Sequence, residues 1–225
     1  MMDLQGFGDQ IATGAMTTLR VAVTNLALGI GVGLCGAMAK LSHYRGLNRL
    51  AGGYTTIIRG VPELLIILIL YFGGTVALTA FFGRYVEVDA FAAGVFSLTI
   101  VFGAYATEVF RAAILAVPAG QIEAANALGL ARILVWRLVI VPQMWRYALP
   151  GIGNLWLTLL KDTALISVVG LEDLMRKTSV AAGSTHDPLT FYLIAAGLYL
   201  SFTSVSLVGL ALLEWHANRG VRFAK

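Results

Sequence analysis

The sequence is poor in charged residues and almost free of cysteine. Only 12% of its 225 residues are Asp, Glu, Lys or Arg, about half the share of a typical soluble domain, whereas 58% are hydrophobic. The single cysteine, Cys35, excludes an intrachain disulfide and says nothing about the redox compartment. The first ten residues contain Asp3 and Asp9 but no basic residue, so they are not expected to be a cleavable signal peptide.

Sequence signatures of catalysis are also missing. No G-x-x-x-x-G-K-[ST] phosphate-binding loop occurs, so the chain is not expected to bind ATP itself. His43, His186 and His216 are far apart, which argues against a metal site, and no convincing pair of catalytic carboxylates can be assembled. We therefore predict no catalytic residue, metal or cofactor in this chain.

Long hydrophobic blocks dominate what remains. Each is close to the length of about 20 residues that crosses a bilayer as a helix. The blocks cover approximately residues 16–39, 55–82, 91–110, 151–170 and 189–213. We predict an all-α membrane protein with five transmembrane helices in a single domain, residues 1–225, and a large loop of mixed composition at about 111–150.

Basic residues are distributed unevenly between the two sides of this arrangement. One side would carry Lys40, Arg45, Arg49, Arg111, Arg132, Arg137, Arg146, Arg219, Arg222 and Lys225, and the other only Arg84, Arg176 and Lys177. Cytoplasmic loops carry the excess of Lys and Arg. The prediction is an N-terminus outside, with the large loop and the C-terminus in the cytoplasm.

The large loop contains a short pattern of small residues. Glu123, Ala124 and Ala125 are followed by Gly129, and after nine more residues by a segment that ends at Pro142. Small alanines allow a helix to approach a partner surface closely, and a glycine permits a sharp exit from that helix. Arg132 and Arg137 can meet acidic groups on such a partner. The alternative is an ordinary amphipathic helix lying on the membrane surface.

This spacing resembles the cytoplasmic coupling motif of permeases in ATP-binding-cassette importers. In that motif EAA, a glycine and an I-x-L-P ending lie at these intervals, and here Val139 and Val141 replace the isoleucine and leucine. Further segments look like the polar amino acid permeases, most of all the Q-type subunits for histidine, arginine, ornithine and opines: RGVPE at 59–63, FGAYATEVFR at 102–111, VPAGQ at 117–121, RYALPGIGN at 146–154, GLEDL at 170–174 and AGST at 182–185.

The resemblance implies the type I importer fold and a set of partners. These are a dimer of ATP-binding-cassette ATPases, which would bind ATP and Mg, a second permease subunit in a heterodimer rather than a homodimer, and an extracytoplasmic amino-acid-binding protein. It also implies a multi-pass location in the bacterial inner membrane, in contact with lipid and with no nucleic acid partner. The function implied is ATP-driven import of polar amino acids, favouring basic ones, by alternating access.

Ionisable residues inside the membrane are costly and are therefore candidates for function. Lys161 and Asp162 lie midway along the predicted fourth helix, about 100° apart around its axis. Thr158 lies one turn before Asp162, and Thr163 and Ser167 add hydroxyl groups nearby. A carboxylate here can recognise an ammonium or guanidinium group, and the alternative for Asp162 is a structural ion pair.

Two more charged residues belong to the predicted pathway. Glu108 lies near the end of the third helix, one turn before Arg111, which can pair with it at the interface. Arg59 precedes Pro62, where a helix can begin, and either lines a cytoplasmic gate, meets a substrate carboxylate or anchors the membrane boundary. Glu63 is then predicted to lie in that helix's first turn.

Gly29 and Gly33 form a G-x-x-x-G pair that predicts close helix packing. Other classes of protein compete with the importer permease. An ion-coupled transporter or channel could use Asp162 and Glu108, but it would have no use for the motif around Glu123. A membrane enzyme would need catalytic geometry that the sequence does not offer.

Overall fold

The computed structural model describes residues 6–219, which form helices joined by short connections, with no strand among them. The α-helices are α1 (Gly8–Lys40), α2 (Arg45–Gly60), α3 (Glu63–Phe82), α4 (Ala90–Leu115), α5 (Ala119–Ala127), α6 (Arg132–Val135), α7 (Val141–Asp162), α8 (Leu174–Thr185) and α9 (Pro188–Ala217). A π-helical turn, η1 (Trp136–Ile140), precedes α7, and a 3₁₀ segment, η2 (Thr163–Val169), follows it.

Five stretches of these described residues are long and apolar enough to cross a membrane. They are Gly8–Lys40, Glu63–Phe82, Ala90–Leu115, Arg132–Val169 and Pro188–Ala217. The predicted all-α fold with five membrane helices is confirmed. Arg222 and Lys225 from the comparison of basic residues, and Asp3 from the signal-peptide prediction, lie outside the described residues.

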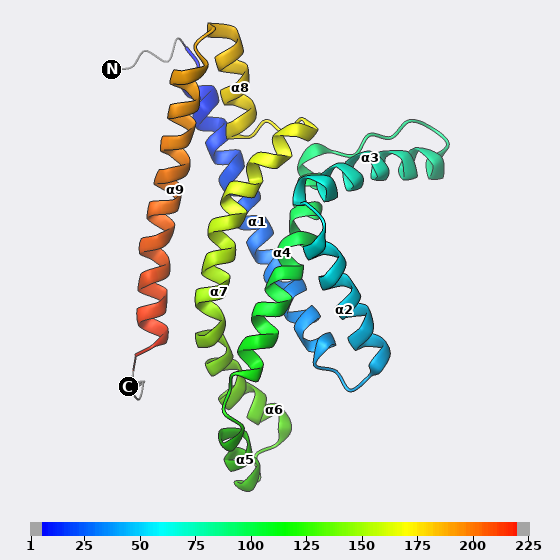
Figure 1. Cartoon of the computed structure of the whole chain (residues 1–225), viewed down its shortest axis with the longest axis vertical. Coiled ribbons are helices and arrows are strands. Elements are labelled where there is room, and N and C mark those ends of the chain that lie inside the picture. The colour runs from blue at the N-terminus through cyan, green and yellow to red at the C-terminus, as the bar shows by residue number, and fades with distance from the viewer. Residues whose placement is uncertain (1–5, 220–225) are drawn as a thin grey trace.

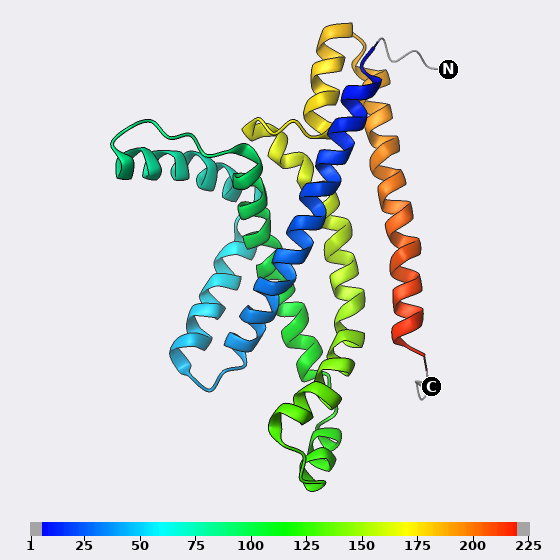
Figure 2. The same cartoon turned by 180° about the vertical axis from the view of Figure 1, so that it is seen from behind.

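Helices α1, α4 and α7 form the centre of the bundle (Figures 1 and 2). Small residues on α1 let α4 approach closely: Gly29 faces Phe102, and a Cβ atom at Gly33 would lie only 2.6 Å from the Cβ of Ala106. The packing role predicted for these two glycines is confirmed. A buried polar pair links the same helices, because the Thr99 hydroxyl donates to Asn25 Oδ1 at 2.8 Å.

The second hydrophobic block is not one helix, which corrects the prediction. Residues 55–60 end α2, and α3 starts at Glu63. Val61 and Pro62 between them are extended, with ψ values of 137° and 135°, and proline has no N–H with which to continue a helix. Figures 1 and 2 show that α3 projects sideways from the bundle, and only Ile66 and Ile67 on it are buried.

The fourth membrane helix also differs from the prediction. The sequence predicts this helix over residues 151–170, with the preceding prolines in a loop, but α7 begins at Val141 and its α-helical part ends at Asp162. Pro142 lies in the first turn of α7, where no backbone N–H is needed, and Pro150 is tolerated inside the helix. Asp162 and Lys161 therefore lie at the C-terminal end of α7, not midway along the helix.

Different segments gather at the two ends of the molecule. At one end lie the start of α1, α8 and the start of α9; at the other lie α5, α6 and the end of α9 (Figure 1). The connection between α1 and α2 lies toward the same end as α5. Segments predicted to share a side of the membrane are thus grouped together in space.

A buried carboxyl group begins α8. Asp173 is fully buried and caps this helix, since its Oδ1 accepts from Arg176 N at 2.9 Å, while Oδ2 has no hydrogen-bond partner among the described residues. The adjacent Leu174 N donates to Thr18 of α1 at 3.1 Å. Burial raises the pKa of Asp173 from 3.8 to about 6.

This shift predicts a stabilising substitution. The folded state holds the Asp173 proton more tightly than the unfolded state does, so the contribution of this group to stability is greatest below pH 4 and is lost as pH rises through 6. Asp173→Asn keeps a good N-cap but cannot ionise. It should raise the melting temperature at pH 7.5, by up to about 3 kcal/mol in stability, with little effect at pH 4.

The measurement is thermal unfolding in detergent across this pH range. Asp89 caps α4 in the same way but is exposed, so Asp89→Asn serves as the matched control and should leave the pH profile unchanged. A destabilised Asp173→Asn protein at pH 7.5 would contradict the assignment.

Candidate functional site

A small pocket lies where α3, α4 and α7 meet. Its volume is about 210 Å³, and its walls are mostly apolar. The lining residues are Glu63 from α3, Leu98, Val101, Phe102 and Tyr105 from α4, and Leu155, Thr158, Leu159 and Asp162 from α7. Pockets for drug-sized ligands measure roughly 300–1,000 Å³, so this one suits a smaller solute.

One wall of the pocket joins the break in the second hydrophobic block to α4. Glu63, the first residue of α3, accepts from the Tyr105 hydroxyl at 3.3 Å. The Arg59 guanidinium carbon lies 5.3 Å from the centre of the Tyr105 ring, within cation–π distance. The extended Val61–Pro62 link therefore brings a cation and an acid, four residues apart, to the same tyrosine.

Asp162 lines the same pocket from α7. Its side chain is half-buried, and no hydrogen bond or ion pair of this carboxylate is found among residues 6–219. Thr158, one turn earlier, shares the pocket face as predicted, and its hydroxyl donates to Asn154 O at 3.2 Å. Lys161 is exposed and does not line the pocket, in agreement with the predicted angular separation.

Two predicted pathway residues do not reach this pocket. Thr163 is buried, and its hydroxyl donates to Leu160 O at 2.7 Å. Ser167 donates to Ala164 O at the same distance. Of the three predicted hydroxyl residues, Thr158 alone lines the pocket together with Asp162.

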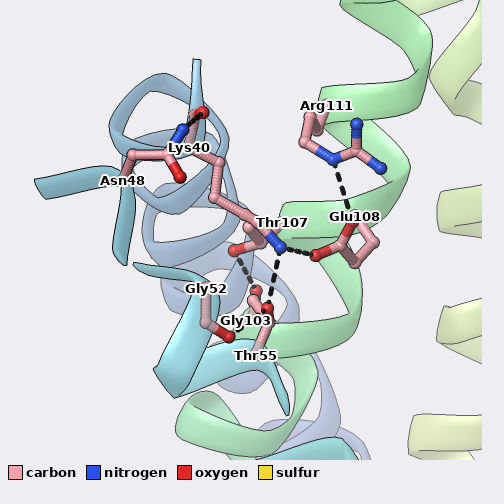
Figure 3. A network of polar contacts seen from close by, with 8 residues as sticks. All are labelled: Lys40, Asn48, Gly52, Thr55, Gly103, Thr107, Glu108 and Arg111. Carbon is pink, nitrogen blue, oxygen red and sulfur yellow. Dashed lines mark hydrogen bonds and ion pairs between the residues drawn. The ribbon is translucent and has the colours of Figure 1, made fainter. Parts of the chain in front are cut away.

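Glu108 belongs to a separate network closer to the α5 end (Figure 3). Its carboxylate pairs with Lys40 at the end of α1 and, at 3.0 Å, with Arg111 one turn along α4. Lys40 also donates to the buried Thr55 hydroxyl of α2 at 3.0 Å. The predicted Glu108–Arg111 pair is confirmed, and Lys40 makes it a three-helix contact that holds α1, α2 and α4 together.

The predicted coupling motif forms a short helix outside the bundle. In α5, Glu123 and Ala124 are exposed, whereas Ala125 is buried against Val117, Val135 and Ile140. A partner can therefore reach the exposed face of α5, while the face that contains Ala125 packs against the rest of this loop region.

Gly129 ends this helix in a left-handed conformation, with φ +73°. Gly129 N donates to Asn126 O at 2.9 Å, and Leu130 N donates to Ala125 O at 3.2 Å. These are the two hydrogen bonds of a Schellman motif, in which glycine is strongly preferred because it has no Cβ. The predicted sharp exit at Gly129 is confirmed.

Basic residues and a proline surround this helix. Arg132 starts α6 and is exposed, as is Arg137 in η1, and Pro142 lies in the first turn of α7. Gln143 of α7 donates to Gln121 of α5 at 2.6 Å, so α5 is tied to a helix that also lines the pocket.

Among the described residues there is no group of three His, Cys, Asp or Glu side chains that could hold a metal ion. The candidate site is thus a small, mostly apolar pocket that includes charged and hydroxyl side chains. The helix α5 is a separate surface element at one end of the molecule. Together with five membrane-length helices, these features define a multi-pass membrane protein built for moving a solute.

Comparison with known proteins identifies the family. The chain belongs to the binding-protein-dependent transport system inner membrane components, whose family profile matches residues 13–219. It is therefore a membrane-spanning permease with a role in transport.

Several characterised relatives match almost end to end. The nopaline transport system permease protein NocQ of Agrobacterium fabrum is 50% identical over 223 residues, covering 96% of this chain and 94% of the relative. The histidine/lysine/arginine/ornithine transport system permease protein HisQ of Escherichia coli is 44% identical over 225 residues, covering 98% and 99%. Both are permeases of amino acid or opine transport systems.

Solved structures agree with this assignment. A chain from the crystal structure of an amino acid ABC transporter with histidines has a TM-score of 0.83 at 32% identity, covering 96% of this chain and 99% of that chain. A chain of the MetNI methionine ABC transporter has a TM-score of 0.74 at 18% identity, which shows a shared fold alone.

Sequence reasoning misses two pocket residues. Glu63 is predicted only as a residue that favours a helix start, which it is, but it also faces the pocket. Tyr105 stands out in the sequence only as part of a family-like segment, although it contacts both Glu63 and Arg59. The signal available is an acid directly after a break in an apolar block, where the chain turns from α2 into α3.

Proposed function

We propose that this permease carries a cationic amino acid or opine through the pocket between α3, α4 and α7. The observation that carries the proposal is the pair of carboxylates, Glu63 of α3 and Asp162 of α7, that line one small, mostly apolar space. Relatives named for histidine, lysine, arginine and ornithine and for nopaline support the same substrate class.

The pocket chemistry suits such a solute. A carboxylate with few partners in a partly desolvated site forms strong charge-assisted hydrogen bonds with ammonium or guanidinium groups. Asp162 would bind the cationic side chain or α-ammonium group, with Thr158 adding a hydroxyl. Arg59 does not line the pocket itself but lies against the ring of Tyr105, which does, and it would meet the substrate carboxylate as it passes. Apolar residues such as Leu98 would contact the aliphatic part of the solute.

The proposed mechanism is alternating access driven from outside the chain. Two ATPase subunits, which bind ATP and Mg, would dock on α5 around Glu123 to Gly129 and pull on it as they close. The contact between Gln121 and Gln143 would pass this movement to α7, and so to Asp162 at its far end. A loaded binding protein would dock at the opposite end, near α8.

Completion of the pathway requires a second permease subunit. Five helices are too few to enclose a route by themselves, and α3 exposes large apolar side chains such as Ile69, Phe72 and Val76, which lipid or a partner must cover. We propose that this partner is a different permease chain in a heterodimer, within a bacterial cytoplasmic membrane.

Reconstitution tests the proposal. The complex, purified in mild detergent and identified by mass spectrometry, should contain an ATPase and a second permease. In vesicles with ATP trapped inside and binding protein outside, it should accumulate labelled arginine or histidine, and collapse of ion gradients should not reduce uptake. Uptake that needs an ion gradient but no ATP would instead establish the ion-coupled alternative through Asp162 and Glu108.

The orientation is a separate prediction. Ten basic residues flank one side of the predicted spans and three the other, so the α5 end should face the cytoplasm. Reporter fusions after Arg84 should read extracytoplasmic, and fusions after Arg132 cytoplasmic. A reversed result at either position would contradict the arrangement.

A further inference from the structure

A second, larger concavity lies away from the substrate pocket, at the membrane boundary. Its volume is about 740 Å³, and it separates the end of α1 from α6 and η1. The lining residues are Met38, Leu41, Ser42, His43, Tyr44, Arg132, Ile133 and Trp136. We call it the α1–α6 groove.

The polar atoms of the groove are rich in donors, and no acid lines it. Arg132 is exposed, and no ion pair of its guanidinium is found among residues 6–219. The Trp136 indole N–H can only donate, and His43 and Tyr44 offer further N–H and O–H groups. An arginine fork with several neutral donors is suited to a phosphate group.

The remaining lining is apolar and open. Met38 is 50% exposed and Ile133 73% exposed, so neither is covered by the chain itself. Both lie where predicted membrane spans end, α1 at Lys40 and the stretch Arg132–Val169 at its start. Trp and Tyr at such a boundary are typical of the headgroup level of a bilayer.

We propose that the α1–α6 groove binds the headgroup of an anionic phospholipid. The phosphodiester would lie against Arg132, the Trp136 N–H and His43, and an acyl chain would run over Met38 and Ile133 toward the bilayer core. A purely ionic partner would leave these apolar side chains unused. In a zwitterionic lipid the headgroup cation lies close to the phosphate and offsets its attraction to Arg132, whereas an anionic lipid has no such cation. Basic pockets at the ends of membrane helices select anionic lipids in this way. The inference requires only that the chain spans a membrane and does not depend on the transported solute.

Quenching of Trp136 fluorescence by brominated lipids tests lipid binding in the α1–α6 groove itself. The full chain is reconstituted in phosphatidylcholine containing a small, fixed fraction of brominated phosphatidylglycerol or brominated phosphatidylcholine. The Trp136 contribution to fluorescence is obtained by comparison with Trp136→Phe. Brominated phosphatidylglycerol should quench this contribution about fivefold more effectively at low mole fraction, the effect expected of one well-placed arginine.

Two matched variants decide the outcome. Arg132→Gln should reduce quenching by phosphatidylglycerol to the level of phosphatidylcholine, while Arg137→Gln, equally exposed but outside the groove, should retain the preference. Mass spectrometry of the lipids retained on the three detergent-extracted proteins gives a reading independent of Trp136. Equal quenching by both lipids would overturn the proposal and leave the groove to the ATPase partner. A preference lost equally in both arginine variants would show general charge attraction and would overturn it as well.

Discussion

Replacement of Gly129 by aspartate should reduce ATP-driven uptake to near background while the permease still reaches the membrane. Gly129 occupies the left-handed C-terminal position of α5, where a residue with a Cβ costs roughly 1–2 kcal/mol. The chain itself leaves open space there, since no atom would lie within 4 Å of a Cβ added at this position. A new side chain would therefore point toward whatever docks on α5.

The added charge should have the larger effect. Arg137 in η1, which is exposed and lies outside the α1–α6 groove, favours an acidic partner surface, so a new carboxylate would face like charge. An unpaired charge buried at an interface costs about 2–5 kcal/mol, or roughly thirtyfold or more in affinity for the ATPase. Uptake and ATPase co-purification should fall together.

The control is the same substitution at another exposed glycine, far from α5 in the sequence. Gly46, in the first turn of α2, also has open space around it and lies on another element. Gly46→Asp should reach the membrane and support normal uptake. Gly129→Ala separates backbone strain from charge and should lose much less than Gly129→Asp. Full ATP-dependent uptake by Gly129→Asp would exclude α5 as the coupling surface.

Much of this architecture is predictable because membrane constraints are simple. A helix that crosses lipid needs a long apolar run, and such runs mark the five spans even though their ends are displaced. Small residues at four-residue spacing predict the α1–α4 contact, because only glycine allows Phe102 to lie against position 29. Gly129 is predictable for a related reason, since few residues end a helix in a left-handed turn.

The wrong predictions arise where a rule based on local sequence, such as proline indicating a loop, does not hold within a packed membrane helix. Pro142 and Pro150 suggest a loop, yet one lies in a first turn and the other inside a helix that its neighbours support. Extension of α7 toward the α5 end moves Asp162 from the expected middle of a helix to the C-terminal end of its α-helical part. The pairing of Glu108 with Lys40 could not be predicted, because the two residues are 68 positions apart and only the packing of α1 on α4 brings them together.

Substitution of Asp162 by asparagine should selectively weaken uptake of basic amino acids. Asparagine keeps the size and hydrogen-bonding capacity of the side chain but removes its charge. A hydrogen bond to a charged group contributes about 1.5–3 kcal/mol, so apparent substrate affinity at the membrane site should fall roughly tenfold to a hundredfold. Asp162→Glu, which retains the charge, should recover part of this loss.

The position of Asp162 allows this substitution to distinguish contact with the solute from a structural ion pair. Glu108 has two cationic partners, and breaking that network should disturb the packing of α1, α2 and α4. Asp162 has no such partner among residues 6–219 and faces a space next to Glu63. Removal of its charge should therefore leave complex yield and basal ATPase activity intact, which removal of a structural ion pair would not.

Complex yield, basal ATPase activity and arginine uptake are measured in the same preparations of each variant. Lys161→Gln removes the adjacent charge, which lies outside the pocket, and so separates local electrostatics from contact with the solute. If Asp162→Asn assembles poorly, the carboxylate is structural. If the variant assembles and transports arginine normally, Asp162 lies outside the pathway. A loss of uptake confined to Asp162→Asn, with normal assembly and partial recovery in Asp162→Glu, is the result that a carboxylate in direct contact with a cationic solute should produce.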